Sequence, residues 1–376
     1  MNGKFAMLSR VSKMIMKTNA RGVTIRDIAE AAGVSHTAVS QALNGKGRQL
    51  RLSEDCAQRI FNAAKRLGYR RNAAAQAIST GRFNAAALVL STVPVRSHLP
   101  IRLQIGAHDA LAAQGRHLIV AYLPDERLTD ARRAPKILTD LMCDGMILQY
   151  HVAIPKALEA MLKRFALPVV RPNVKRAWNC VYPDDKEGGR MLARRLMELG
   201  HRRVGYVDSG FEHNRRAGAL HYSKRDRLAG VAEVLAKAGF GCECLLDDAA
   251  QPTAEATRLE LLGRLVERLR ARDRPTALIG YSPLEAEMAM QAAMFLRMRV
   301  GRDVSVAAVV SEGEQQEGWP IMSAVLPEYA IGHRAAEMLM ARMETPGRDI
   351  RSARLAPYFC GGETAGGFAP RKGRRT

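Results

Sequence analysis

One stretch decides the fold of the N-terminal part, and it reads Val23-Thr24-Ile25-Arg26-Asp27-Ile28-Ala29-Glu30-Ala31-Ala32-Gly33-Val34-Ser35-His36-Thr37-Ala38-Val39-Ser40-Gln41-Ala42-Leu43-Asn44. Thr24 predicts the start of a helix, because a threonine hydroxyl caps the free amide groups of a first turn. Gly33 predicts the end of that helix, because glycine readily adopts the left-handed conformation. Ser35 then caps a second helix that runs to about Leu43. Only a short turn separates the two helices, which is the helix-turn-helix pattern.

A third helix is expected after the first two. Ser53 would cap it, Ile60 would lie on its inward side, and Gly68 would end it. Apolar residues recur at helical spacing in all three helices, so each helix has one side suited to burial. These residues are Ile25, Ile28, Ala29 and Ala32, then Val39 and Leu43, then Ile60, Ala64 and Leu67. The sequence therefore predicts an all-α unit with a small shared core.

The second predicted helix keeps short polar side chains on its outward side. They are Ser35, His36, Thr37, Ser40, Gln41 and Asn44. Side chains of this kind reach base edges or phosphates when a helix lies in the major groove of DNA. Lys46, Arg48 and Arg51 follow in the next loop and suit phosphate contacts. The alternative is a three-helix protein-interaction module whose polar side faces solvent.

The charge of the chain is strongly basic and unevenly distributed. The 376 residues carry 58 Lys+Arg against 37 Asp+Glu, a formal net charge of +21. Residues 1–84 hold 15 Lys+Arg and only 4 Asp+Glu, which is about half of the excess in under a quarter of the chain. Such an excess favours a polyanionic partner, most often nucleic acid and sometimes an acidic membrane surface. The alternative is a charge that serves solubility alone.

Composition excludes several classes of protein. Hydrophobic residues make up 47% and charged residues 25%, which is typical of a globular chain with two or three folded units. The sequence has no run of about 18 apolar residues, so it predicts no membrane span. The first twenty residues are too charged for a signal peptide. The six cysteines show no disulfide framework, and Cys242 and Cys244 have no second Cys/His pair near them in the sequence. We therefore expect reduced thiols and a cytoplasmic protein.

From Ala85 onward, apolar runs alternate with helical patterns. The predicted strands are Ala86–Leu90, His117–Leu123, Gly145–Gln149, Val204–Val207, Thr276–Ile279 and Val304–Val310. Predicted helices include Gly188–Leu199, Leu228–Ala238, Leu284–Arg297 and Ala330–Met343. Buried parallel strands read as continuous apolar runs, so this alternation predicts doubly wound α/β sheets. The segment is too long for one such sheet, and two lobes are expected.

The stretch quoted first, together with Leu67-Gly68-Tyr69-Arg70-Arg71-Asn72, resembles the lactose/galactose repressor (LacI/GalR) family. The resemblance extends more weakly over nearly the whole chain. It implies an N-terminal all-α helix-turn-helix domain followed by an α/β, two-lobed, periplasmic-binding-protein-like domain. The expected segments are a flexible leader (1–20), the helix-turn-helix domain (21–71), a hinge helix and linker (72–84), an effector-binding and dimerisation domain (85–369) and a basic tail (370–376), which we expect to be solvated.

The resemblance also implies which residues contact DNA. In the N-terminal domain they are Thr24, Ser35, His36, Thr37, Ser40, Gln41, Asn44 and Arg48. The family's hinge helix has the pattern Asn-x-x-Ala-x-x-Leu, and Asn72, Ala75 and Ile78 stand at those places. The family's leucine wedges into the minor groove and kinks the duplex. Ile78 is expected to do the same, and the alternative is a packed linker residue.

Two departures from the family change the expected contacts with DNA. Gln41 stands where the family often has Arg. Because Arg pairs with guanine and Gln suits adenine, we expect a different operator base at that position. Arg71 replaces the usual Pro before the hinge, which removes a stiff turn and adds a phosphate contact.

An effector site between the lobes is implied as well. Arg227 precedes Leu-Ala-Gly, where the family's arginine grips the small effector, and Ser223 stands at another contact position. A guanidinium offers forked donors to a hydroxyl pair or a carboxylate, and the alternative for Arg227 is a surface salt bridge. Tyr281-Ser282 and Val310-Ser311 replace the family's Asn-Asp and Asp-Asp, so a simple hexose is not the expected effector. Tyr281 and Trp319 would suit a flatter or more apolar ligand, or be core or lobe-interface residues.

No enzyme motif competes with these expectations. The sequence has no Gly-x-Gly-x-x-Gly after a strand, no phosphate-binding loop, no Gly-x-Ser-x-Gly and no paired histidines for a metal. We predict no enzyme, cofactor or metal. The predicted function is a homodimeric, sequence-specific DNA-binding repressor with a near-palindromic operator and a small-molecule effector, without membrane contact. The alternatives are an activating regulator and a small-molecule binding protein with a vestigial DNA-binding unit.

Overall fold

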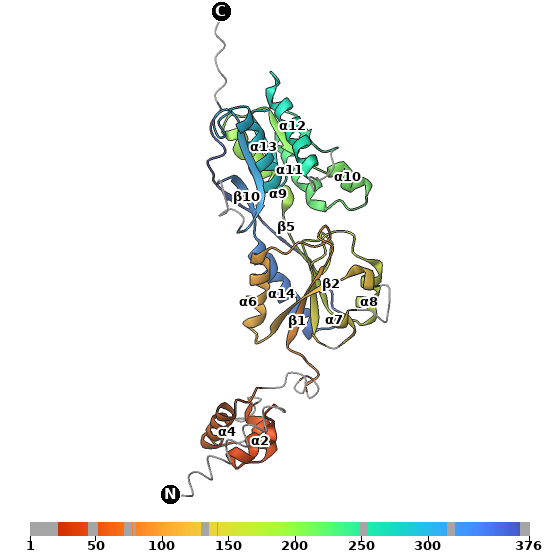
Figure 1. Ribbon diagram of the computed structural model, residues 1–376, viewed down its shortest axis with the longest axis vertical. Coiled ribbons are helices and arrows are strands. Elements are labelled where there is room, and N and C mark those ends of the chain that lie inside the picture. The colour runs from red at the N-terminus through yellow and green to blue at the C-terminus, as the bar shows by residue number, and fades with distance from the viewer. Residues whose placement is uncertain are drawn as a thin grey trace, which may run out of the picture. The chain divides into compact units, whose positions relative to one another are not determined.

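The computed structural model describes residues 22–43, 52–70, 77, 80–128, 135–140, 142–248, 255–313 and 320–368. The chain divides into two compact units, residues 1–82 and 83–376 (Figure 1). The expected leader, most of the hinge helix and the basic tail lie outside the described residues, as do Asn44, Arg48 and Trp319. Within the described ranges, no helix has the length and apolar character needed to cross a bilayer.

The N-terminal unit contains three helices, α2 (Ile25–Ala32), α3 (His36–Leu43) and α4 (Glu54–Leu67). Thr24 caps α2 in a reciprocal capping box with Asp27, and Gly33 ends the helix at φ 64°. Ser53 caps α4, and Gly68 ends it at φ 67°. The predicted helix boundaries are confirmed, because the capping residues act as their chemistry requires.

One small core holds these three helices together. Ile28, Val39 and Ile60, one from each helix, are fully buried in a shared cluster. Burial of a large aliphatic side chain contributes about 1.5–3 kcal/mol. Helices this short are not stable alone in water, so the shared core fixes which side of each helix faces solvent.

The first lobe of the second unit is a six-stranded sheet with the strand order β11-β5-β4-β3-β1-β2, parallel at every pairing. Its strands are β1 (Ala85–Ser91), β2 (His117–Leu123), β3 (Gly145–Leu148), β4 (Val169–Pro172), β5 (Cys180–Pro183) and β11 (Ala353–Leu355). Helices α6 (Ile101–Ala112) and α14 (Glu328–Glu344) cover one face. Helices α7 (Lys136–Thr139) and α8 (Lys156–Arg164) cover the other, and a 3-10 turn spans Asp125–Arg127.

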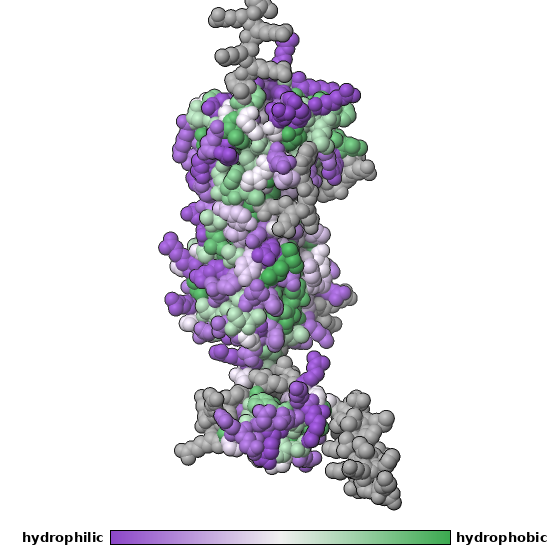
Figure 2. Space-filling model, turned by 90° about the vertical axis from the view of Figure 1, so that its left-hand side faces the viewer, coloured by the Kyte–Doolittle hydropathy of each residue, from purple (hydrophilic) through white to green (hydrophobic). Residues whose placement is uncertain are grey.

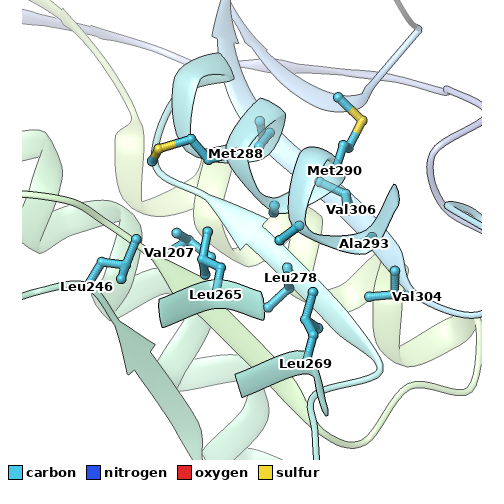
Figure 3. Packing of buried hydrophobic residues seen from close by; sticks show 14 of the residues in the cluster. Val207, Leu246, Leu265, Leu269, Leu278, Met288, Met290, Ala293, Val304 and Val306 are labelled. Atoms are coloured by element: carbon cyan, nitrogen blue, oxygen red, sulfur yellow. The ribbon is translucent and has the colours of Figure 1, made fainter. Parts of the chain in front are cut away.

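The second lobe repeats this architecture with the strand order β12-β10-β9-β8-β6-β7. Its strands are β6 (Val204–Val207), β7 (Cys242–Leu245), β8 (Ala277–Gly280), β9 (Ser305–Ser311), β10 (Met322–Leu326) and β12 (Tyr358–Cys360), of which only β12 is antiparallel. Helices α9 (Asp185–Glu198) and α11 (Tyr222–Lys237) pack on one face. Helices α12 (Glu255–Arg270) and α13 (Pro283–Phe295) pack on the other (Figure 3), and α10 (Phe211–Arg216) is a short helix before α11.

The described chain passes between the lobes at three places, after β5, after β10 and after β11. Each lobe is therefore built from separate parts of the sequence. The predicted two-lobed α/β fold is confirmed, and the six predicted strands lie within one or two residues of the observed ones.

Glycines allow two pairs of helices to touch backbone to backbone. A Cβ at Gly230 of α11 would lie 2.0 Å from the carbonyl oxygen of Lys186, and one at Gly189 of α9 would lie 2.1 Å from that of Arg227. The α6–α14 pair uses Gly106 and Gly332 in the same way. This approach brings α11 close against the start of α9.

We predict that Gly230→Ala destabilises the second unit by about 2–3 kcal/mol, because the rigid backbone of α9 has to move. Gly263→Ala is the matched control, because a Cβ at that helical position meets no atom within 4 Å. It should stabilise by about 0.5–1 kcal/mol through helix propensity. Urea unfolding measures both changes, and equal effects of the two substitutions would contradict the close contact.

Candidate DNA-binding surface and inter-lobe cavity

The outer side of α3 is polar and open to solvent. Ser35, His36 and Thr37 are exposed, and Ser40 and Gln41 are half-buried. Ser35 also accepts a hydrogen bond from the amide of Ala38 at 3.2 Å, so its hydroxyl caps the start of α3. Hydrophilic side chains cover much of the visible face of the N-terminal unit (Figure 2). The arrangement offers several polar groups from one helix to a partner.

The hydroxyl of Thr24, like that of Ser35, is engaged at the start of its helix. It lies 2.8 Å from Asp27 Oδ2 and accepts from the Asp27 amide at 3.4 Å. The backbone and side-chain bonds from Thr24 hold the pKa of Asp27 below its usual value. Asn44, Arg48, Asn72, Ala75 and Ile78 lie outside the described residues, so their contacts stay predictions.

A cavity of about 550 Å³ lies between the two lobes of the second unit. The first lobe contributes His98, His151 and Asn173 to its wall, among others. The second lobe contributes all three residues expected to bind effector, which are Ser223, Arg227 and Tyr281. Cavities of about 300–1,000 Å³ are typical of small-molecule sites.

Arg227 is held by partners of its own lobe. Its Nε donates to Asp185 Oδ1 at 2.7 Å, and its Nη1 donates to the carbonyl oxygen of Tyr281 at 2.7 Å. Burial acts to lower the pKa of Arg227, but Asp185, together with Tyr281 and Tyr206, more than offsets it, so the net shift is upward and the guanidinium stays charged. Only 7% of Arg227 is exposed, which excludes an ordinary surface salt bridge.

A second buried pair joins Lys224 to Asp208. Lys224 also donates to the carbonyl oxygen of Ser209 at 3.1 Å. Burial raises the pKa of Asp208 to about 6, and Lys224 offsets only part of this effect. One carboxylate oxygen of Asp208, and likewise one of Asp185, is buried without a hydrogen-bond partner. Both pairs therefore leave an acceptor for a water molecule or ligand with a hydrogen to donate.

The ring of Tyr281 contacts both of these cations. Its centroid lies 4.2 Å from Lys224 Nζ and 4.5 Å from Arg227 Cζ. Its hydroxyl lies 2.9 Å from Ser223 Oγ. Tyr281 thus organises this part of the cavity wall, and stacking on a ligand stays a prediction.

Sequence reasoning missed most of the polar partners in the cavity. Neither Asp185 nor Lys224 was predicted, and no spacing rule links Asp185 to Arg227, 42 residues away. Nor did any pattern single out His151, Asn173 or His221. Only the folded sheets bring these residues together, because parallel strands end at one edge.

Comparison with known proteins agrees with both units. Residues 24–72 match the family model for bacterial regulatory proteins of the lacI family. Residues 193–364 match the model for the periplasmic binding protein-like domain. The chain belongs to the LacI/GalR family. As a LacI-family protein, it is a DNA-binding transcriptional regulator.

Relatives of this LacI-family protein match it over most of their length. The maltose regulon regulatory protein MalI of Escherichia coli is 25% identical over 353 residues, which cover 88% of this chain and 96% of MalI. The transcriptional regulator GalS of Salmonella typhimurium is 28% identical over 248 residues, or 64% and 68% of the two chains. Both are named as regulators rather than enzymes.

Solved structures share the fold. The Lac repressor dimer bound to operator and the anti-inducer ONPF superposes with a TM-score of 0.71 at 19% identity, over 92% of this chain and 99% of that one. A complex of the transcriptional regulator CelR with cellobiose gives a TM-score of 0.58 at 22% identity, over 91% and 100%. At these identities the likeness concerns architecture.

We predict that Arg227→Met costs the second unit about 3–5 kcal/mol, because Asp185 is left buried without its cation. The double substitution Arg227→Met with Asp185→Leu should cost less than the sum of the two single changes. Arg194→Met is the control, because its pair with Glu187 is more exposed and should contribute at most about 1 kcal/mol. Chemical denaturation measures all four variants, and additive losses would contradict the coupling.

Proposed function

We propose that this regulator is a homodimeric repressor that inserts α3 into the major groove of a near-palindromic operator. A small molecule in the inter-lobe cavity would control its affinity for the operator. The observation that carries the proposal is the outward polar side of α3 on a unit that holds about half of the net charge. Such a regulator would act in the cytoplasm, where bacterial DNA lies.

The DNA contacts divide by chemistry. We infer that His36, Thr37 and Gln41 reach base edges, since they project from one side of α3. Ser35 and the cations of the following loop, among them Arg48, would bind phosphates and set the position of the helix. The hinge residues Asn72, Ala75 and Ile78 would enter the minor groove.

Exposed apolar side chains support a dimer. On the first lobe, Val120 and Tyr122 project from the edge strand β2, and 59% of Tyr122 is exposed. Near them in sequence, Ile101 and Ile105 of α6 are exposed as well. On the second lobe, Phe295 at the end of α13 is 68% exposed. Exposed apolar groups that gather in one patch mark protein–protein contacts, and two-fold pairing would match a near-palindromic operator.

Control by an effector follows from the position of the cavity. A ligand that touches both lobes favours the arrangement in which both contacts form. Coupling of this kind amounts to about 1–3 kcal/mol. The operator and anti-inducer bound to the Lac repressor and the cellobiose bound to CelR support the same two classes of partner here. Arg227, Ser223 and Tyr281 would hold the effector.

Selection of bound sequences from a random DNA pool, with and without a cell-metabolite extract, tests this function. We expect one enriched, near-palindromic site, bound more weakly as salt rises because counterions are released from DNA. Enrichment should change when the extract is present. Uniformly weak binding to all sequences would overturn the proposal.

We predict that Gln41→Arg shifts base preference from adenine toward guanine at one symmetric pair of operator positions. A good bidentate contact discriminates by about 1–3 kcal/mol. Gln58→Arg is the matched control. Gln58 is exposed on α4, so this substitution adds the same charge outside α3. It should leave the selected sequence unchanged, and an unchanged sequence for Gln41→Arg would remove its base-reading role.

We also predict that Tyr122→Glu combined with Phe295→Glu converts the dimer to monomers, because each protomer would bury two charges in the interface. Phe165→Glu serves as the control, since Phe165 is exposed at the end of α8, on the opposite face of the sheet from α6. Sedimentation velocity reports the masses. A double variant that stays dimeric would place the interface elsewhere.

A further inference from the structure

Two histidines face each other in the inter-lobe cavity, one from each lobe. His151 comes shortly after β3 in the first lobe, and His221 caps the start of α11 in the second. Both line the cavity, and their ring centroids lie 5.8 Å apart. Because the rings meet where the lobes meet, the charge on each ring affects how closely the lobes approach.

Asn173, directly after β4, connects the first lobe to this site. His221 Nε2 lies 3.0 Å from the backbone oxygen of Asn173, and the Tyr222 hydroxyl donates to Asn173 Oδ1 at 3.0 Å. Nearby, Lys175 Nζ lies 2.5 Å from Asp226 Oδ2. Each of these contacts joins a residue of the first lobe to one of the second, so all of them form only when the two lobes are close together.

The partners of His221 fix where its ring proton lies. Nδ1 accepts from the backbone N–H of Ser223 at 3.4 Å and lies 2.7 Å from Ser223 Oγ. Because a carbonyl oxygen only accepts, Nε2 carries the proton that is donated to Asn173. A second proton would have to sit on Nδ1, where it would be donated to Ser223 Oγ but would oppose the Ser223 N–H. Protonation therefore removes the acceptor that caps the first turn of α11.

His151 is held neutral in a similar way. Its Nε2 lies 2.9 Å from Gln149 Nε2, which also donates to the carbonyl oxygen of His98 at 2.9 Å. The reversed amide would place two oxygens in contact, so the Gln149 nitrogen donates and His151 Nε2 accepts. The single ring proton of His151 is then on Nδ1.

The surroundings disfavour a charge on either ring. Burial lowers the pKa of His151 to about 3, and the neighbouring His221 and His98 add to the effect. Burial also lowers the pKa of His221; the Asn173 carbonyl and Asp185 oppose this, while Arg227 and Lys224 reinforce it. Tyr222 and Tyr281 add uncharged hydroxyls. Every element packed around the pair is thus compatible with two neutral imidazoles.

We propose that His151, His221 and Asn173 form a pH-sensitive clasp, which holds the lobes together while both imidazoles are neutral and releases them when acid protonates either ring. The consequence for gene control rests on the proposed function, because lobe closure would set operator affinity. The clasp itself belongs to the second unit and requires no DNA.

The direction of the pH effect follows from linkage. Both histidines have a lower pKa with the lobes together than when exposed, so closure is favoured above the ordinary histidine pKa of about 6.5 and is lost as pH falls below it. Each pH unit below this value shifts the equilibrium toward the open form by up to about tenfold per histidine. Two histidines together give up to about a hundredfold per unit.

Hydrogen–deuterium exchange of the full chain between pH 7.5 and 5.5, corrected for the intrinsic pH dependence of exchange, tests the clasp. We expect peptides covering residues 149–152, 170–176 and 219–226 to lose at least tenfold protection at pH 5.5, while peptides of β8 and β9 keep theirs. The variant His151→Gln with His221→Asn should show the same protection at both values, since Asn still caps a helix.

His213→Asn is the matched control, because His213 is exposed on α10, and it should keep the wild-type response. Asp208 titrates in the same range, but it lies in the second lobe, so the histidine variant separates the two causes.

Unchanged protection in the wild type, or a full response in the double variant, would overturn the clasp. If the double variant does not fold, His221→Asn alone decides, and its response should be smaller than that of the wild type by up to about tenfold per pH unit. Failure to bind DNA would overturn the proposed function and leave the exchange result valid.

Discussion

The packing of Val39 against Ile28 and Ile60 is the contact on which the function of the protein depends. Helix α3 has eight residues and is too short to be stable alone, so its orientation comes from this contact. With Val39 and Ala42 turned inward, the polar residues at the start of α3 have to face solvent. Apolar packing therefore sets the direction of the polar surface that we propose binds DNA.

The second unit separates a fixed part from an adjustable part. The pairs Arg227–Asp185 and Lys224–Asp208 lie wholly within the second lobe and hold one wall of the cavity rigid. Bonds between the lobes include those of Asn173 and the Lys175–Asp226 pair. Three chain crossings keep the lobes attached while their separation changes. The proposed effector would thus meet a preformed wall on one side and a movable one on the other.

Local chemistry made much of this fold predictable. Capping residues such as Thr24 and Gly33 marked helix ends, and fully buried strands such as β6 read as apolar runs. The edge strand β7 was missed, because its side chains are half-buried or exposed and form no such run. In the cavity, Arg227 was predicted from the family resemblance, but its partner Asp185 was not, since long-range pairing leaves no spacing signal.

Methylation protection at guanine N7 tests most directly whether the outer side of α3 enters the major groove. The DNA would be the site selected for this protein, since N7 lies on the major-groove edge of guanine. We expect two clusters of protected guanines, one in each half-site, centred about one helical turn apart. The claim would be contradicted if the protein fully occupied the site and every guanine N7 were still methylated as strongly as in free DNA.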